Sequence, residues 1–267
     1  MKQIPNLFTL LNLVFGCIAI VLILQTNESF YQTINGEERL LLPEQITRAA
    51  LFIFAAAVVD FLDGFLARLL KAPSEMGKQL DSLSDVVSFG VAPGMILYQM
   101  LRMGYARGEN GLDISTALLL PAFLYTAAVA WRLAKFNIST NQSSSFRGVP
   151  SPAAGLLIAS FPLIYWYEYF GLQALFINQW FLYAAIVIIS YLLVCNRTFM
   201  ALKFTSYGVK ENGLKYALVV LAVVSIILLK WLAVPVIFIA YLIFSMFSKE
   251  SPVTTQTTSS GTIDITV

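Results

Sequence analysis

The chain alternates long apolar segments with short polar connections. Apolar stretches of about 16–25 residues have the length of membrane-spanning helices, because about 20 apolar residues in a helix cross the hydrocarbon core of a bilayer. We expect eight such helices, at residues 5–25, 46–70, 81–103, 115–136, 152–170, 178–195, 214–230 and 232–247. The pattern predicts an all-α membrane protein, a polytopic helical bundle with a six-helix core and two C-terminal helices.

These segments divide the chain into three parts. Residues 1–195 hold the first six helices, and residues 196–250 hold a cytoplasmic loop and the two C-terminal helices. Residues 251–267 contain many Thr and Ser and few apolar residues, so we expect a disordered cytoplasmic tail. The first apolar run, from Leu7, is long enough to span and is followed by no small-x-small cleavage site, so we interpret it as a membrane helix rather than a signal peptide.

Composition narrows the possible chemistry. The chain is 58% hydrophobic and 12% charged, whereas soluble domains have about 25% charged residues. The net charge of +2 is too small to suggest a nucleic-acid partner. Histidine is absent, which excludes His-based triads and His-ligated zinc. Cys17 and Cys195 do not have the spacing of a metal site. Carboxylates remain, and they favour hard ions such as Mg²⁺ or Mn²⁺.

The distribution of basic residues predicts the orientation. Cytoplasmic loops of membrane proteins carry an excess of Lys and Arg. With a cytoplasmic N-terminus and eight spans, twelve of the 17 basic residues lie inside. The five outside are Arg39, Arg48, Arg102, Arg107 and Lys230. Both termini are then expected in the cytoplasm of a multi-pass protein.

Four aspartates stand in a fixed frame within this low-charge chain. The frame reads Asp60-Phe-Leu-Asp63-Gly64-Phe-Leu-Ala67-Arg68, then eight residues, then Gly77-Lys-Gln-Leu-Asp81-Ser-Leu-Ser-Asp85. Each ionised carboxylate costs about 2.5–3.5 kcal/mol at mid-membrane. Four together also repel one another, so a divalent metal is the expected counter-charge.

Helical spacing brings the aspartates together. Residues three or four apart share a helix face, so Asp60 and Asp63 project together from the end of one helix. Asp81 and Asp85 project together from the start of the next, and the turn between the helices contains Pro73. The four carboxylates then converge, which suits two divalent ions about 3.5–4 Å apart. The alternative is that they are helix caps and surface charges.

The residues beside the aspartates suggest a ligand pocket. Gly64 and Ala67 continue the stripe with little bulk, which leaves room for a flat ligand against the helix. Arg68 offers a fork for phosphate oxygens. Asp85 is the last member of the frame, on a face that could also meet an incoming hydroxyl, and is our candidate for the general base.

As spaced, these residues match the D-x-x-D-G-x-x-A-R-x8-G-x3-D-x3-D signature, and the chain resembles the CDP-alcohol phosphotransferases. The resemblance implies a metal-dependent membrane enzyme that cleaves a CDP-linked donor, passes its phosphoalcohol group to a hydroxyl and releases CMP. It implies that Asp60 and Asp81 bridge two metals, that Asp63 and Asp85 each complete one site, and that Asp85 also activates the acceptor. Gly64, Ala67 and Arg68 would line the CDP pocket, with Gly77 in the same frame and Ser74 near the phosphates.

Further stretches resemble the bacterial membrane-type phosphatidylserine synthases. They are the segments 5–12, 81–93, 132–137 and 146–152. This resemblance implies CDP-diacylglycerol as the donor, L-serine as the acceptor, surrounding membrane lipid and a homodimer in the bacterial cytoplasmic membrane. The count of basic residues predicts that the active site lies on the cytoplasmic side.

Serine carries a carboxylate that needs a cation, and an arginine can hold one with two hydrogen bonds. We expect Arg132, Lys135 and Arg147 on the same membrane side as the aspartates. The alternatives for these residues are the positive-inside bias and binding of lipid headgroups. Asn6 and Thr9 are polar at helical spacing with Asn12 and are candidates for nucleotide contact; capping at Asn6 and helix–helix hydrogen bonding at Asn12 are equally open.

Two alternative functions follow from the same residues. Another acceptor, glycerol 3-phosphate or inositol, would keep the reaction class, although a phosphorylated acceptor would need more basic residues. Intramembrane carboxylates also occur in cation transporters. The clustering of these aspartates at one membrane face, with no internal repeat, argues against a transporter.

Overall fold

The architecture comes from a computed structural model of the 267-residue chain. It describes residues 4–25, 31–34, 37–40, 44–70, 74–106, 114–138, 148–200 and 209–247. Two features expected from the sequence, the tail at 251–267 and the basic residue Arg147, lie outside these ranges.

Helices dominate the described chain. The long ones are α1 (Ile4–Leu24), α2 (Glu44–Leu69), α3 (Glu75–Asp85), α4 (Ala92–Ala106), α5 (Ala122–Ile138), α6 (Ser151–Tyr167), α8 (Gln179–Val194), α9 (Val209–Leu229) and α10 (Ala233–Phe247). The short ones are the π-helical turn η1 (Val86–Val91), α7 (Gln173–Phe176) and the 3-10 turns η2 (Thr116–Leu118), η3 (Tyr169–Gly171) and η4 (Lys230–Leu232). The prediction of an all-α membrane protein is confirmed.

Each of the eight predicted segments contains a helix, but some boundaries differ. The third helix begins at Glu75 rather than at residue 81, because Ser74 caps its N-terminus with a hydrogen bond from the Gly77 amide at 2.9 Å. The fourth begins at Ala122, just after Pro121, a residue that favours helix starts. A small antiparallel hairpin of β1 (Tyr31–Ile34) and β2 (Glu37–Leu40) stands in the loop before α2 and was not predicted.

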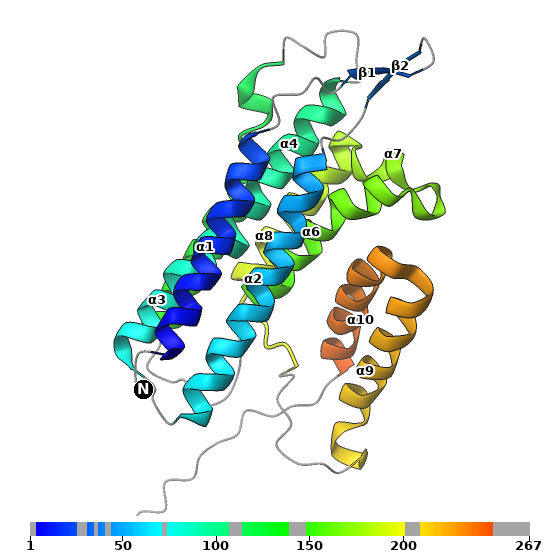
Figure 1. Cartoon of the computed structure of the whole chain (residues 1–267). Helices are drawn as coiled ribbons and strands as arrows, with labels where there is room; N and C mark the ends of the chain where they lie inside the picture. Colours follow the sequence, from blue (N-terminus) through cyan, green and yellow to red (C-terminus); the bar gives the residue numbers. More distant parts are fainter. Residues whose placement is uncertain are drawn as a thin grey trace, which may run out of the picture.

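Four helical stretches in the described chain have the length and apolar composition to cross a membrane. They are Pro5–Leu24, Glu44–Leu69, Glu75–Ala106 and Asn212–Phe247. The last of these turns back at η4, where Lys230 has a positive φ of 52°, so α9 and α10 form a hairpin (Figure 1). The shorter helices α5, α6 and α8 have 17, 17 and 16 residues, or roughly 25 Å at 1.5 Å per residue.

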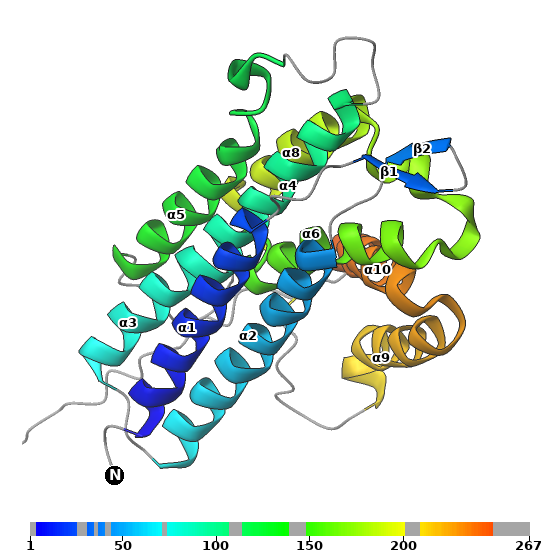
Figure 2. The same cartoon turned by 45° about the horizontal axis from the view of Figure 1, so that its top comes forward.

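Helix α1 packs along α2 on one side and along the α3–η1–α4 rod on the other (Figures 1 and 2). Two serines of the rod close this second contact. The Ser84 hydroxyl donates to the Thr9 carbonyl at 3.0 Å, and the Ser88 hydroxyl donates to the Asn12 carbonyl at 2.9 Å. Small polar residues allow close helix approach in membranes, so this contact fixes α1 against the helix that carries Asp85.

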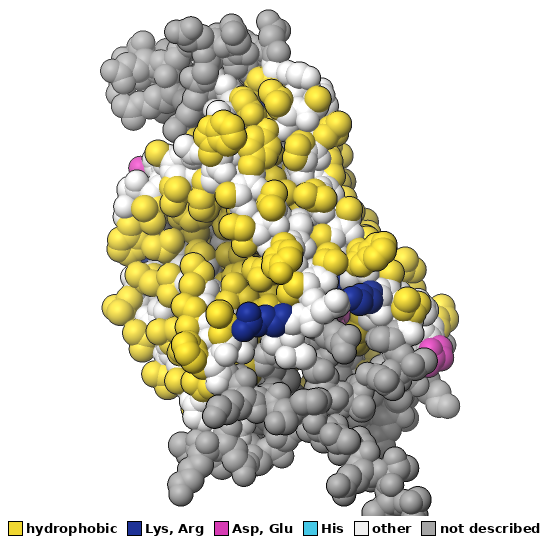
Figure 3. Space-filling view, turned by 180° about the vertical axis from the view of Figure 1, so that it is seen from behind, with side chains coloured by type: hydrophobic (Ala, Val, Ile, Leu, Met, Phe, Trp, Pro, Cys, Tyr) yellow, Lys and Arg dark blue, Asp and Glu magenta, His cyan; other side chains and the backbone are white. Residues whose placement is uncertain are grey.

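The outside of the bundle is apolar. Seen from behind, hydrophobic side chains cover most of the described surface, and the few Lys and Arg side chains in view lie toward its lower part (Figure 3). Exposed residues on four different helices include Val58, Trp131, Ile227 and Phe247. A water-exposed surface of this kind would be unfavourable, and in a bilayer it faces lipid.

The helix ends that carry the polar motif residues meet at one end of the bundle. The start of α1, the end of α2 and the start of α3 meet there, and the end of α5 lies beside α3 (Figure 2). The motif residues of the sequence come from these helix ends.

Candidate metal and donor-binding site

The aspartates converge as the helical spacing predicts. Asp60 and Asp63 come from the last turns of α2, and Asp81 comes from α3. Each of the three offers a carboxylate oxygen, and these oxygens lie within 4.8 Å of one another. The arrangement is compatible with metal ligation, because a single cation can be reached by oxygens that are this close.

Asp85 lies one turn further along α3 and is buried, with 6% of its surface exposed. The Asn12 side-chain amide donates to its Oδ1 at 3.4 Å. Its charged neighbours are the other three aspartates and Arg132. Asp85 therefore neighbours the other three aspartates and also Arg132 of α5.

The carboxylates lack positively charged partners among the described residues, and a metal ion would supply one. Within the part of the chain that the structure describes, none of the four forms an ion pair with a Lys or Arg. Asp63 is 6% exposed, and its Oδ2 has no hydrogen-bond partner among the described residues. A buried, unpaired carboxylate is costly in a membrane protein. The donor set contains only oxygens, so a hard divalent cation fits.

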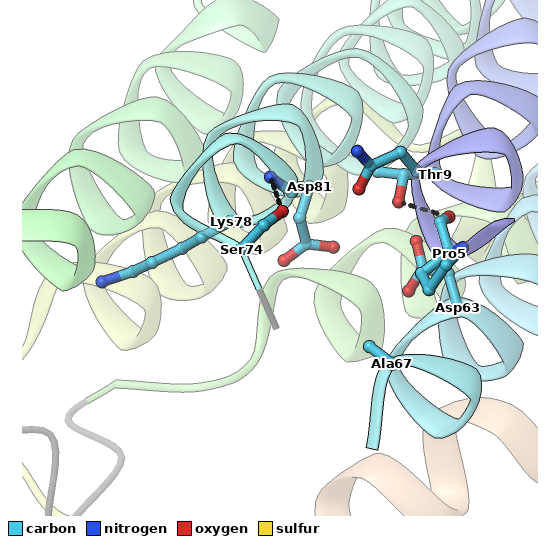
Figure 4. Close-up of a pocket in the computed structure, with 10 residues that line it drawn as sticks. Pro5, Thr9, Asp63, Ala67, Ser74, Lys78 and Asp81 are labelled. Carbon is cyan, nitrogen blue, oxygen red and sulfur yellow. Dashed lines mark hydrogen bonds between the residues drawn. The ribbon is translucent and has the colours of Figure 1, made fainter. Parts of the chain in front are cut away.

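A pocket of about 240 Å³ opens beside the cluster (Figure 4). Its lining comes from the starts of α1 and α3 and the end of α2: Pro5, Asn6, Thr9, Asp63, Gly64, Ala67, Ser74, Gly77, Lys78 and Asp81. Six of the seven residues predicted to bind the donor are in this set. The seventh, Arg68, is exposed in the last turn of α2 and does not line the pocket.

Two glycines without side-chain bulk, Gly64 and Gly77, shape this pocket. A Cβ on Gly77 would lie 2.9 Å from Asn6 Oδ1 and 3.0 Å from Ser74 Oγ, so glycine lets α1 and the start of α3 meet. A Cβ on Gly64 would meet nothing within 4 Å, so this face of α2 is open to a ligand. Carboxylates of Asp63 and Asp81 turn toward the space between the helices (Figure 4).

Lys78 and Pro5 line the pocket and were not predicted. The Lys78 side chain extends away from the pocket centre (Figure 4), and its ammonium lies 5.8 Å from the centroid of the Phe136 ring. This distance suits a cation–π contact. The positive-inside count placed Lys78 on the same membrane side as the aspartates, but only the fold places it beside α5.

The predicted acceptor residues lie on α5. The Arg132 Nη1 donates to Ser151 Oγ at 3.0 Å, while its Nε is buried without a partner among the described residues. Lys135 is exposed, and its Nζ donates to Asn196 Oδ1 at 2.6 Å. Arg147 falls outside the described residues. Arg132 is therefore the one of the three that the structure places beside Asp85.

The glycine after Arg147 anchors the start of α6. Gly148 has a φ of +78° and its amide donates to the Arg197 carbonyl at 3.0 Å. An added Cβ would collide with the Leu193 carbonyl oxygen. Glycine tolerates both constraints, which explains its place in the Arg147–Pro152 stretch. The contact joins the start of α6 to the end of α8.

A π-helical turn directly follows Asp85, and sequence periodicity did not reveal it. Pro93 has no amide hydrogen, so it cannot donate to the Phe89 carbonyl four residues earlier. The Tyr125 hydroxyl donates to that carbonyl instead, at 2.5 Å, and Thr126 Oγ1 donates to the Gly90 carbonyl at 2.9 Å. Such turns occur often at functional sites. Here α5 stabilises the irregular turn.

Comparison with known proteins agrees with this geometry. The profile of the CDP-alcohol phosphatidyltransferase family matches residues 2–191. A Helicobacter pylori protein named CDP-diacylglycerol–serine O-phosphatidyltransferase is 31% identical over 248 residues, covering 91% of this chain and 89% of that protein. A Bacillus subtilis protein of the same name is 37% identical over 163 residues, covering 60% of this chain and 77% of its own length.

A Saccharomyces cerevisiae protein with that name is 36% identical over 125 residues, covering 43% of this chain and 41% of its own. The family match spans the helices that build the aspartate cluster and the pocket. The resemblance inferred from the aspartate frame is confirmed, and the chain belongs to the CDP-alcohol phosphatidyltransferase family.

Proposed function

We propose that the protein transfers the phosphatidyl group of CDP-diacylglycerol to the hydroxyl of L-serine and releases CMP. The observation that carries this proposal is the joint presence of the aspartate cluster and of relatives bearing that enzyme name along nearly the whole chain. The helical membrane architecture suits a donor with a lipid tail and a water-soluble head. The steps below follow from the residues around the cluster.

Asp60, Asp63, Asp81 and Asp85 would hold two divalent ions, Mg²⁺ or Mn²⁺. Two observations support this assignment: Asp63 Oδ2 has no hydrogen-bond partner among the described residues, and the cluster offers only oxygen ligands. Bound ions of this kind neutralise the diphosphate charge and stabilise developing charge on the transferring phosphoryl group. By the family pattern, Asp60 and Asp81 would each ligate both ions, and the two carboxylates contact each other.

The donor's CDP group would occupy the pocket between α1, α2 and α3. Gly64 and Ala67 leave its α2 wall open, and Asn6 and Thr9 offer polar atoms on the α1 side. Ser74 and Gly77 lie at the helix start of α3, where phosphate oxygens are favoured. Arg68 is exposed at the end of α2, so we assign it to the outer phosphate or to the membrane-facing rim rather than to the pocket wall.

Serine would bind on the opposite side of Asp85, against α5. The buried Nε of Arg132 lacks a partner among the described residues, and a substrate carboxylate would satisfy it. Asp85 then takes the proton from the serine hydroxyl while the oxygen attacks the phosphorus, and CMP leaves. Lys135 and Arg147 would add positive charge at the entrance.

We place the enzyme in the bacterial cytoplasmic membrane as a multi-pass homodimer surrounded by lipid. The cluster and both termini are assigned to the cytoplasmic side, where serine is available. The basic-residue count supports this orientation, and the apolar exterior of the bundle supports burial in lipid. We retain the division into a core of residues 1–195, a part comprising 196–250 and a tail of 251–267.

The deciding experiment offers purified protein CDP-diacylglycerol together with a panel of alcohols and measures CMP release. We expect metal-dependent release with L-serine and formation of phosphatidylserine. Glycerol 3-phosphate or inositol as the preferred acceptor would keep the reaction class and overturn the assigned acceptor. Absence of CMP release with every alcohol would overturn the whole proposal.

A further inference from the structure

The C-terminal hairpin of α9 and α10 lies beyond the residues that the family profile matches, 2–191. The hairpin packs against the helices of the matched region. Helix α10 packs on α6, and η4 at its tip also contacts α6. Phe238 and Tyr241 of α10 are buried, with 8% and 7% of their surfaces exposed. The buried face of α10 therefore has a partner within the chain.

That partner includes the end of the segment 195–200, which follows α8. Two side chains of α10, one turn apart, hold a single residue of this segment. The Met200 amide donates to Ser245 Oγ at 3.2 Å, and the Tyr241 hydroxyl donates to the Met200 carbonyl at 3.2 Å. The Tyr241 ring also stacks on Phe199, with centroids 6.3 Å apart and planes at 25°. Position and tilt of the segment are thereby fixed by α10.

The other end of the same segment contacts the proposed acceptor side. Asn196 accepts from Lys135 Nζ at 2.6 Å, and the Arg197 carbonyl accepts from the Gly148 amide at 3.0 Å. Gly148 leads into Ser151, the hydrogen-bond partner of Arg132. Arg132 has both Asp85 and Tyr241 among its charged or ionisable neighbours. The segment thus joins α10 to Lys135 of α5 and to the start of α6, which carries the hydrogen-bond partner of Arg132.

We propose that Tyr241 and Ser245 are positioning residues for the acceptor side of the site, acting through the segment 195–200 and Arg132. The inference rests on the proposed function, because it takes the α5 side of Asp85 as the place where the acceptor binds. The donor pocket is lined by α1, α2 and α3 and contains no residue of α10. The hairpin therefore affects the acceptor and leaves the donor pocket unchanged.

The test compares kinetic constants of Tyr241→Phe and Ser245→Ala with those of the unmodified protein. Tyr241→Phe keeps the ring stack and removes only the hydroxyl. Loss of one hydrogen bond predicts a rise of about three- to tenfold in KM for the acceptor, with KM for CDP-diacylglycerol unchanged. Ser245→Ala is expected to change the constants in the same direction.

A matched control is Tyr183→Phe. Its hydroxyl also donates to a backbone carbonyl, that of Leu118 in η2, at 2.6 Å, and lies 3.0 Å from the Tyr105 hydroxyl. We expect the control to leave both KM values unchanged. Thermal unfolding in detergent checks that all three variants are folded. Parallel rises in both KM values, or a change in kcat alone, would overturn the inference.

A double variant tests whether the effect passes through Arg132. In an Arg132→Lys background, which loses the guanidinium fork, adding Tyr241→Phe should raise the acceptor KM by less than it does alone. Full additivity would overturn the route through Arg132. The assays use whichever alcohol the unmodified protein accepts. Failure of serine as substrate of the unmodified protein therefore counts against the proposed function, and unchanged acceptor KM in the variants counts against this inference.

Discussion

At the scale of single residues, the molecule concentrates unpaired charge where it is most costly. Asp63 and Asp85 are buried, and Asp63 Oδ2 has no partner among the described residues. In contrast, the exposed pair of Arg48 and Glu44, 2.7 Å apart, sits at the start of α2 where water or headgroups can solvate it. An arrangement this unfavourable is maintained only where a ligand compensates for it, which is the basis of the metal assignment.

Removal of divalent metal should therefore reduce stability as well as activity. Addition of Mg²⁺ or Mn²⁺ to metal-stripped protein is expected to stabilise the fold by about 2–3 kcal/mol at a hundredfold excess over Kd. Thermal unfolding with and without chelator measures the effect. Asp63→Asn should weaken it, whereas Glu75→Gln, an exposed change on α3, should not. A melting temperature that does not respond to metal would contradict the cluster's assigned role.

The proposed role as general base separates Asp85 from the other three aspartates. Asp85→Asn keeps the shape and the hydrogen-bonding reach to Asn12 but cannot take a proton. We expect kcat to fall by about a hundredfold or more, because general base catalysis contributes that much, while donor binding is partly retained. Steady-state kinetics measure the fall in kcat, and binding of CMP to the nucleotide pocket measures the retained donor affinity. Turnover within about twofold of the unmodified protein would exclude Asp85 as the base.

The sequence predicted most of this site because its residues obey helical spacing. Asn6, Thr9, Gly64, Ala67, Ser74 and Gly77 line one pocket because i, i+3 and i+4 positions share a face on three adjacent helix ends. Arg68 fits the same spacing but is exposed at the end of α2, outside the pocket lining. Asn12 as a partner of Asp85 needed the three-dimensional contact between α1 and α3.

At the scale of elements, helix existence was predictable and helix irregularity was not. The lengths of the apolar stretches predicted where the helices lie. The π-helical turn at Val86–Val91 rotates the following side chains about the helix axis by a fraction of a turn, and the hydrophobic periodicity does not reveal this rotation. Pro93 was a local signal that a carbonyl would lose its donor. Its replacement donor, Tyr125, lies 36 residues from Phe89 and could not be identified without the fold.

The contact between α1 and the α3–η1 rod should be the most sensitive helix interface near the site. A Cβ on Gly16 would lie 2.9 Å from Ser88 Cα and would collide with Ser88 Oγ. Gly16→Ala should therefore destabilise the protein by about 1–3 kcal/mol and lower kcat, because α1 carries Asn12 against Asp85. Unfolding in detergent and steady-state kinetics check both effects.

Gly213→Ala provides the control for Gly16→Ala. An added Cβ at Gly213 in α9 meets nothing within 4 Å, and alanine favours helix by up to about 1 kcal/mol. Its stability should be unchanged or slightly higher. Equal effects of the two substitutions would show that general helix propensity, rather than the Gly16–Ser88 contact, determines the outcome.

At the scale of the whole molecule, the chain combines an apolar exterior with one polar end. The orientation of that end in the membrane follows only from the count of basic residues. Glu75 is exposed at the start of α3, beside the site, and Ser115 is exposed before η2 at the opposite end of the bundle. The two positions therefore report on opposite faces of the membrane.

Single cysteines at these positions, in a background with Cys17 and Cys195 replaced by serine, test the orientation. Ser115→Cys should react with a membrane-impermeant maleimide in intact cells, whereas Glu75→Cys should react only after the membrane is opened. The physical reason is that the eight-span prediction assigns twelve of the 17 basic residues to the side of Glu75, and positive segments are retained in the cytoplasm. The reverse labelling pattern would place the aspartate cluster outside, away from cytosolic serine, and the proposed function would then lack its acceptor.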